Sequence, residues 1–216
     1  MTEEKHTRIF VSKNTQNPEV FVLFYEEEGL FSNFHPANFK INVNENPLDI
    51  GWNKERIVEF SCSEQYFMYK KAILVHDEAS AHKILMALEP MRMKLLGRRL
   101  KMSKEDLLNW SEKSRIAMYR ACLEKFAQNQ RLRLYLFRTH GMKLVEASAN
   151  DAIWGNGLDK YDPRSENRET WQGTNWLGEI LDKVREELWI RTEFRAEREK
   201  VLLEPFETRC QLLEGF

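Results

Sequence analysis

The chain lacks several features that would place it outside ordinary globular proteins. It has three cysteines, an odd number, and no cysteine–histidine spacing typical of a zinc site. No apolar run approaches the roughly 18 residues of a membrane span, and the first residues lack the apolar region of a secretory signal. We therefore expect reduced thiols, no metal, no membrane partner, and a cytoplasmic location, with a nuclear one also open.

The chain also lacks an excess of charge of either sign. Its 33 basic and 34 acidic residues leave a net charge of −1. This excludes an overall basic field for nucleic acid, although a local basic pocket stays open. The 216 residues, 42% of them hydrophobic, are enough for one domain with a sizeable core.

Hydrophobic periodicity predicts short strands in the first and last thirds of the chain and helices elsewhere. Strands are expected at 20–25, 39–43, 57–60 and 144–147. Helices are expected from about 63 to 75, over 78–88, from Pro90 to a stop at Gly97, from Ser103 to 128 with a restart at Ser111, over 129–139, and from about Trp176 past Lys200.

The stretch from Glu59 to Leu74 carries the main candidate chemistry. It is predicted to be the end of a strand, a polar break and then a helix. Ser61 or Ser63 is expected to cap that helix, because a serine oxygen accepts a hydrogen bond from an unpaired backbone N–H. Ser61 and Glu64 also have the spacing of a capping box.

One face of this predicted helix brings an acid and an amine together. Glu64, Phe67, Met68 and Lys71 follow helical spacing, which puts the two charged groups roughly 10 Å apart along the axis. An amine among apolar side chains loses hydration, so its pKa falls and it becomes a candidate nucleophile. The alternative is a capping glutamate and a snorkelling lysine on an ordinary core helix.

Polar residues outside this helix have both functional and structural interpretations. Asn33, set between aromatic residues, presents an amide to a ligand or satisfies loop backbone groups. Arg98 and Arg99 bind phosphate or form a solvated basic turn. Asp151 precedes Trp154 in a glycine-containing loop. The acid is suited to a proton or a hydroxyl, whereas the indole stacks on a base or sugar, or simply packs in a turn.

In chain order, these motifs resemble the NADAR family, also called YbiA-like, over about Phe21 to Leu188. The matching motifs are Phe31-Ser32-Asn33-Phe34, Ser63-Glu64-Gln65-Tyr66-Phe67 with Lys71, Pro90 through Gly97-Arg98, Asn109-Trp110-Ser111, Leu144-Val145-Glu146, Asp151 with Trp154-Gly155-Asn156-Gly157, and Asn175-Trp176-Leu177-Gly178. The chain departs from the family at Gln65, where bacterial members often have His, and in longer segments at 42–56 and 159–171. These departures bear on substrate choice more than on reaction class.

The resemblance implies an α+β fold, a compact and mostly helical single domain packed around a small β-sheet. The family-like catalytic domain is expected over 19–190. We expect a flexible N-terminal segment at 1–18 and a charged helical extension at 191–216.

The resemblance also implies an N-glycosidase that cleaves a base–ribose bond through a lysine–sugar Schiff base. The expected substrate is ADP-ribosylated guanine, in nucleic acid or as a nucleotide, or a phosphoribosylamino-pyrimidine of the riboflavin pathway. Nucleic acid is thus a partner only as a modified substrate, and no cofactor or metal is expected. The alternatives are a non-catalytic ADP-ribose- or nucleotide-binding module and a helical interaction domain.

Each candidate site residue has an expected role. Lys71 would form the adduct, Glu64 would transfer a proton, and Asp151 would hold a ribose hydroxyl or water. A simpler route uses two carboxylates without the amine. The substrate-binding candidates are Trp154, Asn33, Arg98, Gly155 and Asn175.

Overall fold

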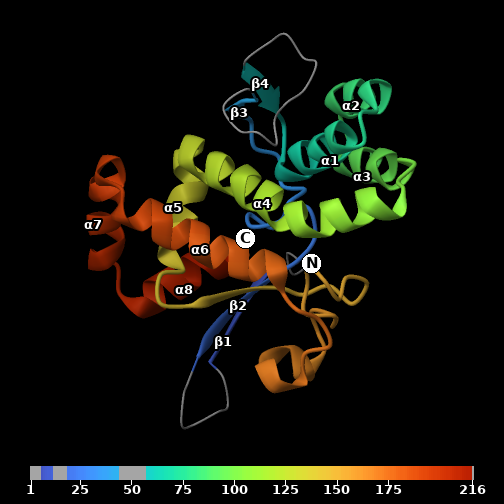
Figure 1. Cartoon of the computed structure of the whole chain (residues 1–216). Helices are drawn as coiled ribbons and strands as arrows, with labels where there is room; N and C mark the ends of the chain where they lie inside the picture. The colour runs from blue at the N-terminus through green and yellow to red at the C-terminus, as the bar shows by residue number, and fades with distance from the viewer. Residues whose placement is uncertain (1–5, 12–18, 44–56, 216) are drawn as a thin grey trace. The chain divides into compact units, whose positions relative to one another are not determined.

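The computed structural model describes residues 6–11, 19–43 and 57–215 (Figure 1). Most of the expected flexible segment 1–18 and of the long segment 42–56 lies outside these ranges. The chain divides into two compact units. We call Asn33–Asn129 the central unit, and Met1–Ser32 together with Gln130–Phe216 the terminal unit.

The terminal unit contains a three-stranded sheet in the order β1-β2-β5. Strand β2 (Val20–Phe24) pairs antiparallel with β1 (Thr7–Val11) and parallel with β5 (Lys143–Glu146). Figure 1 draws β1 and β2 side by side in blue. Strands β2 and β5 were predicted, whereas β1 was not, because its apolar run is short and lies among polar residues. Parallel pairing buries β2, which explains its continuous apolar sequence.

Two helices of the terminal unit pack against this sheet, and others pack on those. A core cluster on the sheet contains Phe21, Leu23, Tyr25, Val145 and Ala147. Helix α6 packs on β5, α8 on β1, and α7 and α8 both contact α5. The helical elements are α5 (Gln130–Arg138), η2 (Pro163–Glu166), η3 (Arg168–Thr170), α6 (Trp176–Ile190), η4 (Thr192–Phe194), α7 (Arg195–Leu203) and α8 (Phe206–Glu214).

The predicted single helix from Trp176 past Lys200 is wrong. Helix α6 ends at Ile190, and Arg191 has an extended backbone before η4 and α7 begin. The charged C-terminal segment instead returns to α5 through two bidentate ion pairs. Arg133 donates to Glu197 at 2.8 and 2.7 Å, and Arg138 donates to Glu204 at 2.8 and 2.8 Å. These long-range pairs favour a break in the helix, because a straight continuation would not return to α5.

The central unit packs four helices beside a two-stranded antiparallel sheet. The sheet pairs β3 (Phe39–Asn42) with β4 (Ile57–Phe60). Phe60 lies edge-on to Tyr66 and Tyr69 of the first helix, with ring centroids 5.1 and 5.4 Å apart. That helix contacts the other three (Figure 1). The helices are α1 (Ser63–Leu74), α2 (Glu78–Leu85), α3 (Pro90–Arg98) and α4 (Lys104–Gln128).

Two predicted helix boundaries in this unit are wrong, and one is confirmed. Ser103 caps α4 in a capping box with Asp106, as a helix start at this serine requires. Ser111 does not restart the helix, because α4 is continuous. Gly97 does not end α3, which runs on to Arg98. A Cβ at Gly97 would overlap the Met68 side chain, so this glycine serves close packing of α3 on α1. The α+β class is confirmed.

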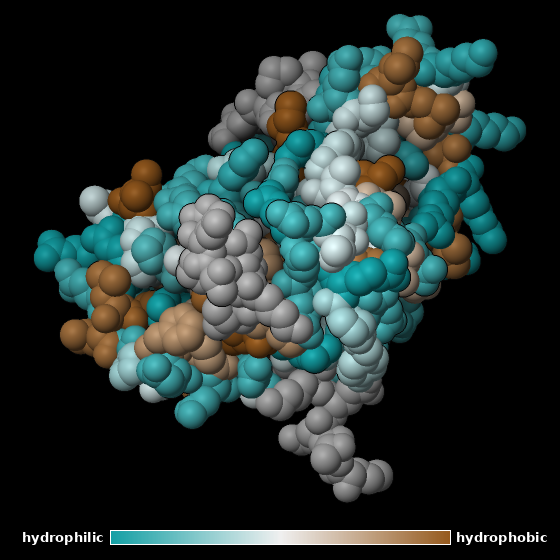
Figure 2. Space-filling view, turned by 90° about the horizontal axis from the view of Figure 1, so that it is seen from below, coloured by the Kyte–Doolittle hydropathy of each residue, from teal (hydrophilic) through white to brown (hydrophobic). Residues whose placement is uncertain are grey.

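The surface of the described residues is mixed. Figure 2 shows hydrophilic side chains, in teal, over most of the face that it draws, with hydrophobic ones, in brown, in separate groups. In the part of the chain that the structure describes, no helix is both long and apolar enough to span a membrane.

Candidate active site

The start of α1 is fixed by its neighbours and not by a serine cap. The N-cap residue is Cys62, and it makes no side-chain capping bond. The expected caps Ser61 and Ser63, and the capping box of Ser61 with Glu64, are therefore wrong. Ser61 instead donates its backbone N–H and its hydroxyl to Gln65 Oε1, at 2.7 and 3.2 Å. The first turn is thereby tied down from outside the helix backbone.

The predicted face of α1 is covered by two other helices of the central unit. The Phe67 ring contacts Trp110 of α4, with centroids 4.8 Å apart and an interplanar angle of 49°. Met68 contacts Gly97 of α3. Glu64, which is 5% exposed, precedes these contacts by one turn, and half-buried Lys71 follows them. Helices α3 and α4 thus pack over the interval between the acid and the amine.

The electrostatics of Lys71 connect three of the predicted site residues. Burial lowers the pKa of the Lys71 amine below its ordinary value, Glu64 opposes this shift, and Arg98 adds to it. Glu64 and Arg98 therefore both lie close enough to act on the Lys71 amine, and all three residues belong to the central unit. A lowered pKa increases the neutral, nucleophilic fraction of the amine at a given pH.

The other two candidates of the central unit have different environments. Asn33 is 9% exposed, its carbonyl accepts from the Glu64 N–H at 3.1 Å, and its Oδ1 accepts from Cys122 Sγ at 4.0 Å. It thus satisfies backbone at the start of α1 and lies beside the acid. Arg98 and Arg99 are exposed at the end of α3. Arg98 lowers the pKa of the Lys71 amine, so its guanidinium lies near that amine. This is the placement expected of a residue that binds a substrate phosphate there.

A second perturbed amine lies in this unit and was not predicted. Lys125 is 1% exposed in α4, with its Nζ 5.4 Å from the centroid of the Phe126 ring. Burial lowers the pKa of Lys125 to about 8, while Cys122 and Cys62 act in the opposite direction. Helical periodicity places Lys125 on the apolar face of its helix, and this is the sequence signal that could have identified it. Its amine is enclosed, whereas that of Lys71 is half exposed.

In the terminal unit, the loop after β5 is closed by its own acid. Asp151 Oδ1 accepts from the backbone N–H groups of Ile153 and Trp154, at 3.1 and 2.8 Å. The carbonyls of Ile153 and Trp154 in turn accept from Trp176 and Leu177, the first residues of α6, at 3.2 and 3.0 Å. The indole rings of Trp154 and Trp176 meet edge-on, with centroids 5.8 Å apart. Half-exposed Trp154 is thus held by backbone on both sides.

Gly155 and Asn175 help to close this loop. The Gly155 carbonyl accepts from the Asn175 N–H at 2.9 Å. The Asn175 amide accepts from Glu146 N–H at 3.0 Å and donates to Leu144 O at 2.9 Å. Asn175 has a left-handed backbone, with φ of 52°. Its side chain therefore fastens α6 to β5, and contact of Asn175 or Gly155 with a substrate stays a prediction.

The predicted site residues fall into two groups. Within the central unit the structure brings Glu64, Lys71, Arg98 and Asn33 into one neighbourhood. Within the terminal unit it brings Asp151, Trp154, Gly155 and Asn175 into one loop system. That both groups line one cleft stays a prediction.

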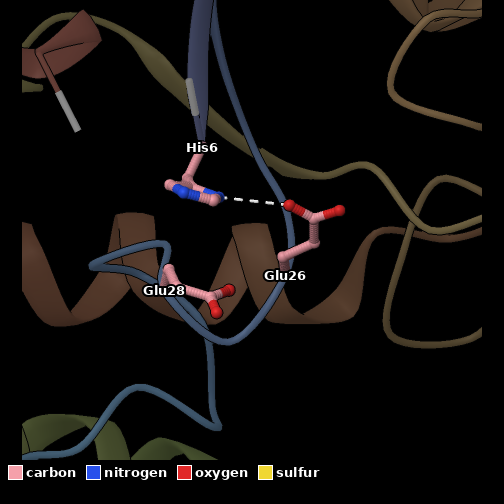
Figure 3. Close-up of side chains that lie close together, drawn as sticks. All are labelled: His6, Glu26 and Glu28. Atoms are coloured by element: carbon pink, nitrogen blue, oxygen red, sulfur yellow. Dashed lines mark hydrogen bonds and ion pairs between the residues drawn. The ribbon is translucent and has the colours of Figure 1, made fainter. Parts of the chain in front are cut away.

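A histidine and two acids in the terminal unit have metal-ligand chemistry. The ligating atoms of His6, Glu26 and Glu28 all lie within 4.8 Å of one another. Figure 3 shows the His6 ring directed toward Glu26, with Nδ1 3.1 Å from Oε2. Lys160 Nζ lies 2.7 Å from the other Glu26 oxygen. An internal cation thus already neutralises the acid that a metal would need, and we assign this cluster no ion.

Comparisons with known proteins place these features in a family. A model described as the NADAR domain matches residues 21–189. Protein irg-1 of Caenorhabditis elegans is 58% identical over 98% of this chain and 99% of that protein. N-glycosidase R617 of Acanthamoeba polyphaga mimivirus is 33% identical over 73% of this chain and 86% of that protein. The NMR structure of E. coli YbiA aligns with a TM-score of 0.56 at 31% identity, covering 79% of this chain and 85% of that one.

Proposed function

This chain belongs to the NADAR family, and on that premise we propose that it is an N-glycosidase that uses Lys71 as its nucleophile. The observation that carries the proposal is the half-buried Lys71 amine, whose pKa is lowered by burial and influenced by Glu64 and Arg98 within one unit. An ordinary snorkelling lysine would keep its amine hydrated and its pKa near the usual value. Relatives named as N-glycosidases support the reaction class.

The proposed reaction splits bond cleavage into two easier steps. The substrate carries an amino nitrogen on C1′ of ribose. Donation of that nitrogen's lone pair opens the ring to an imine, and the ring oxygen takes a proton. Neutral Lys71 adds to C1′, the bond from C1′ to the base nitrogen breaks, and the base leaves as an amine after gaining a proton. Water then hydrolyses the lysine–sugar imine, which releases the sugar and restores the amine.

Glu64 is the proposed proton carrier for the ring oxygen or the leaving nitrogen. It follows the N-cap of α1 by two residues, is almost fully buried, and lies close enough to Lys71 to act on its amine, which is where a proton carrier is required. In this proposal Asp151 holds a ribose hydroxyl or the hydrolytic water, Trp154 stacks on the substrate, and Arg98 holds phosphate. Asn33, Gly155 and Asn175 position polar groups.

Two substrate classes share the required linkage. ADP-ribosylated guanine and phosphoribosylamino-pyrimidines both join an amino nitrogen to C1′ and carry phosphate. The net charge of −1 supports a small molecule or a modified nucleic acid held by a local patch, because no overall basic field attracts a long polyanion.

The decisive experiment traps the imine. Borohydride added during turnover reduces a lysine–sugar imine to a stable amine, and peptide mapping then locates the sugar. We expect the adduct on Lys71 and not on enclosed Lys125. Lys71→Ala should abolish both trapping and activity, whereas Lys71→Arg keeps the charge but should also fail, since guanidinium forms no such imine.

The substrate arm incubates the protein with phosphoribosylamino-pyrimidine and with ADP-ribosylated guanine in DNA, RNA and nucleotide form, and measures sugar release. Full activity of Lys71→Ala would eliminate the covalent route and leave the two-carboxylate route. Tight ligand binding without turnover of any substrate would favour a non-catalytic ADP-ribose- or nucleotide-binding module.

A further inference from the structure

Gln65, the residue after the proposed proton carrier, has a side chain engaged at both ends. It is 3% exposed. Its Oε1 accepts from the backbone N–H and the hydroxyl of Ser61, at 2.7 and 3.2 Å. Its Nε2 donates to the carbonyls of Ile84 and Leu85, both at 3.1 Å, and of Ala87 at 3.4 Å. The two acceptor positions of the amide oxygen are both used by Ser61, and the two hydrogens of Nε2 are shared among the three carbonyls.

These contacts join two helix ends that each need partners. Ile84 and Leu85 lie in the last turn of α2, where the final carbonyls have no partner within the helix, although the Ile84 carbonyl also accepts from the Ala87 N–H just beyond it, at 3.2 Å. Ser61 precedes α1, whose N-cap makes no side-chain capping bond. Gln65 therefore caps the end of α2 and fixes the approach to α1 in one step.

Glu64 lies inside this arrangement. Its own N–H is held by the Asn33 carbonyl at 3.1 Å. The first turn of α1 is thus fastened on one side by Asn33 and on the other by Gln65. A carboxyl that transfers a proton loses rate when it is displaced by fractions of an ångström, so the fastening of this turn matters to the chemistry.

We propose that Gln65 is a positioning residue for Glu64, which locks the first turn of α1 to the end of α2 and makes no contact with the substrate. The proposal rests on the proposed function, because Glu64 is its point of action. If Gln65 makes no contact with the substrate, then having Gln65 where bacterial members of the family often have His does not change the choice of substrate.

The test compares two glutamines of the central unit. Gln65→Met keeps the side-chain length and removes every hydrogen bond of the amide. The matched control is Gln128→Met at the end of α4. Gln128 also bonds in both directions: its Oε1 accepts from Lys40 N–H and its Nε2 donates to Lys40 O, both at 2.8 Å. It fastens α4 to β3, away from the first turn of α1.

We expect Gln65→Met to lower kcat on the order of 10²-fold with KM nearly unchanged. Gln128→Met should leave kcat within about twofold, whatever it costs in melting temperature. Gln65→His retains one donor and one acceptor on its ring, so it should recover part of the lost kcat. If Gln65→Met does not fold, the same comparison is made with Gln65→His, which should show a smaller fall in kcat.

A second readout does not depend on turnover. Glu64 raises the pKa of Lys71. If Gln65→Met displaces Glu64, an NMR titration of the Lys71 side chain should show a lower pKa in that variant and no change in Gln128→Met. An unchanged Lys71 titration, or a raised KM with unchanged kcat, would overturn the proposal. Absence of glycosidase activity in the wild-type protein would instead remove the proposed function, with the titration still deciding the role of Gln65.

Discussion

The two groups of predicted site residues are held in place in different ways. Glu64 and Lys71 lie on one helix, so their separation is set by the helical repeat and their surroundings by α3 and α4. Asp151 and Trp154 lie in a loop, whose shape depends on hydrogen bonds from Asp151 itself and from the start of α6. The first pair is positioned by packing, and the second pair by backbone.

This difference assigns different consequences to substitutions. A side chain on a packed helix can lose its chemistry while the helix persists, because neighbouring contacts hold the backbone. A loop residue that caps its own backbone has a structural and a chemical role at once. Substitutions that separate these roles test whether the terminal unit contributes chemistry or only shape.

The largest effect after loss of Lys71 is expected from Glu64→Gln, which keeps the shape of the side chain and removes its transferable proton. A positioned proton-transfer group contributes up to about 10⁴-fold, and we expect a fall in kcat of at least about 10³-fold with the melting temperature little changed. The rising limb of the pH–rate profile should also move to lower pH, because Glu64 raises the pKa of Lys71.

Glu59→Gln is the control for that variant. Glu59 lies in β4 and forms an exposed ion pair with Lys40 at 3.7 Å. Its replacement should change neither kcat nor the pH limb. An unchanged kcat in Glu64→Gln would mean that Glu64 is not the proton carrier. It would also weaken the inference that the residues on α1 carry the chemistry.

A smaller effect is expected from Asp151→Asn. The asparagine oxygen can still accept from Ile153 and Trp154, so the loop should keep its shape, while the negative charge is lost. We expect a fall in kcat on the order of 10²-fold without a change in melting temperature. Asp151→Ala, which also loses the cap, should cost about 1 kcal/mol of unfolding free energy.

Wild-type kinetics in Asp151→Asn, together with the stability loss in Asp151→Ala, would mean that Asp151 acts only as a loop cap. The terminal unit would then contribute shape, and the carboxyl chemistry would rest with Glu64 alone.

The sequence was informative where structure is local. The helical repeat predicted the shared face of Glu64 and Lys71, and short apolar runs predicted β2, β3, β4 and β5. It failed at positions decided by distant partners. Ser61 is a good cap by local rules, yet Gln65 takes its hydrogen-bonding groups. The break after Ile190 agrees with ion pairs to α5, which no local pattern contains.

The candidate site shows the same division. Spacing identified Lys71, but the influence of Arg98 on its pKa required the packing of α3 on α1. The contact of Trp110 with Phe67 also joins helices that are distant in sequence. The order of the motifs did not predict where Trp110 would pack. Lys125 was missed because a lysine in a helix is usually solvated, whereas this one is 1% exposed.

The smallest expected effect is that of Arg98→Gln, and it differs from that of Glu64→Gln in direction. Arg98 lowers the pKa of Lys71, so its removal should raise that pKa and move the rising limb of the pH–rate profile to higher pH. Because Arg98 is exposed and screened, kcat/KM at pH 7 should fall by less than about tenfold through this effect. Loss of phosphate binding would add a rise in KM, which separates the two roles.

Arg99→Gln is the matched control, since the adjacent exposed arginine is not among the charges that shift the pKa of Lys71. If the rising limb lies at the same pH in Arg98→Gln and Arg99→Gln, Arg98 does not act on the amine. If the limb moves in opposite directions in Arg98→Gln and Glu64→Gln, both charges lie beside Lys71.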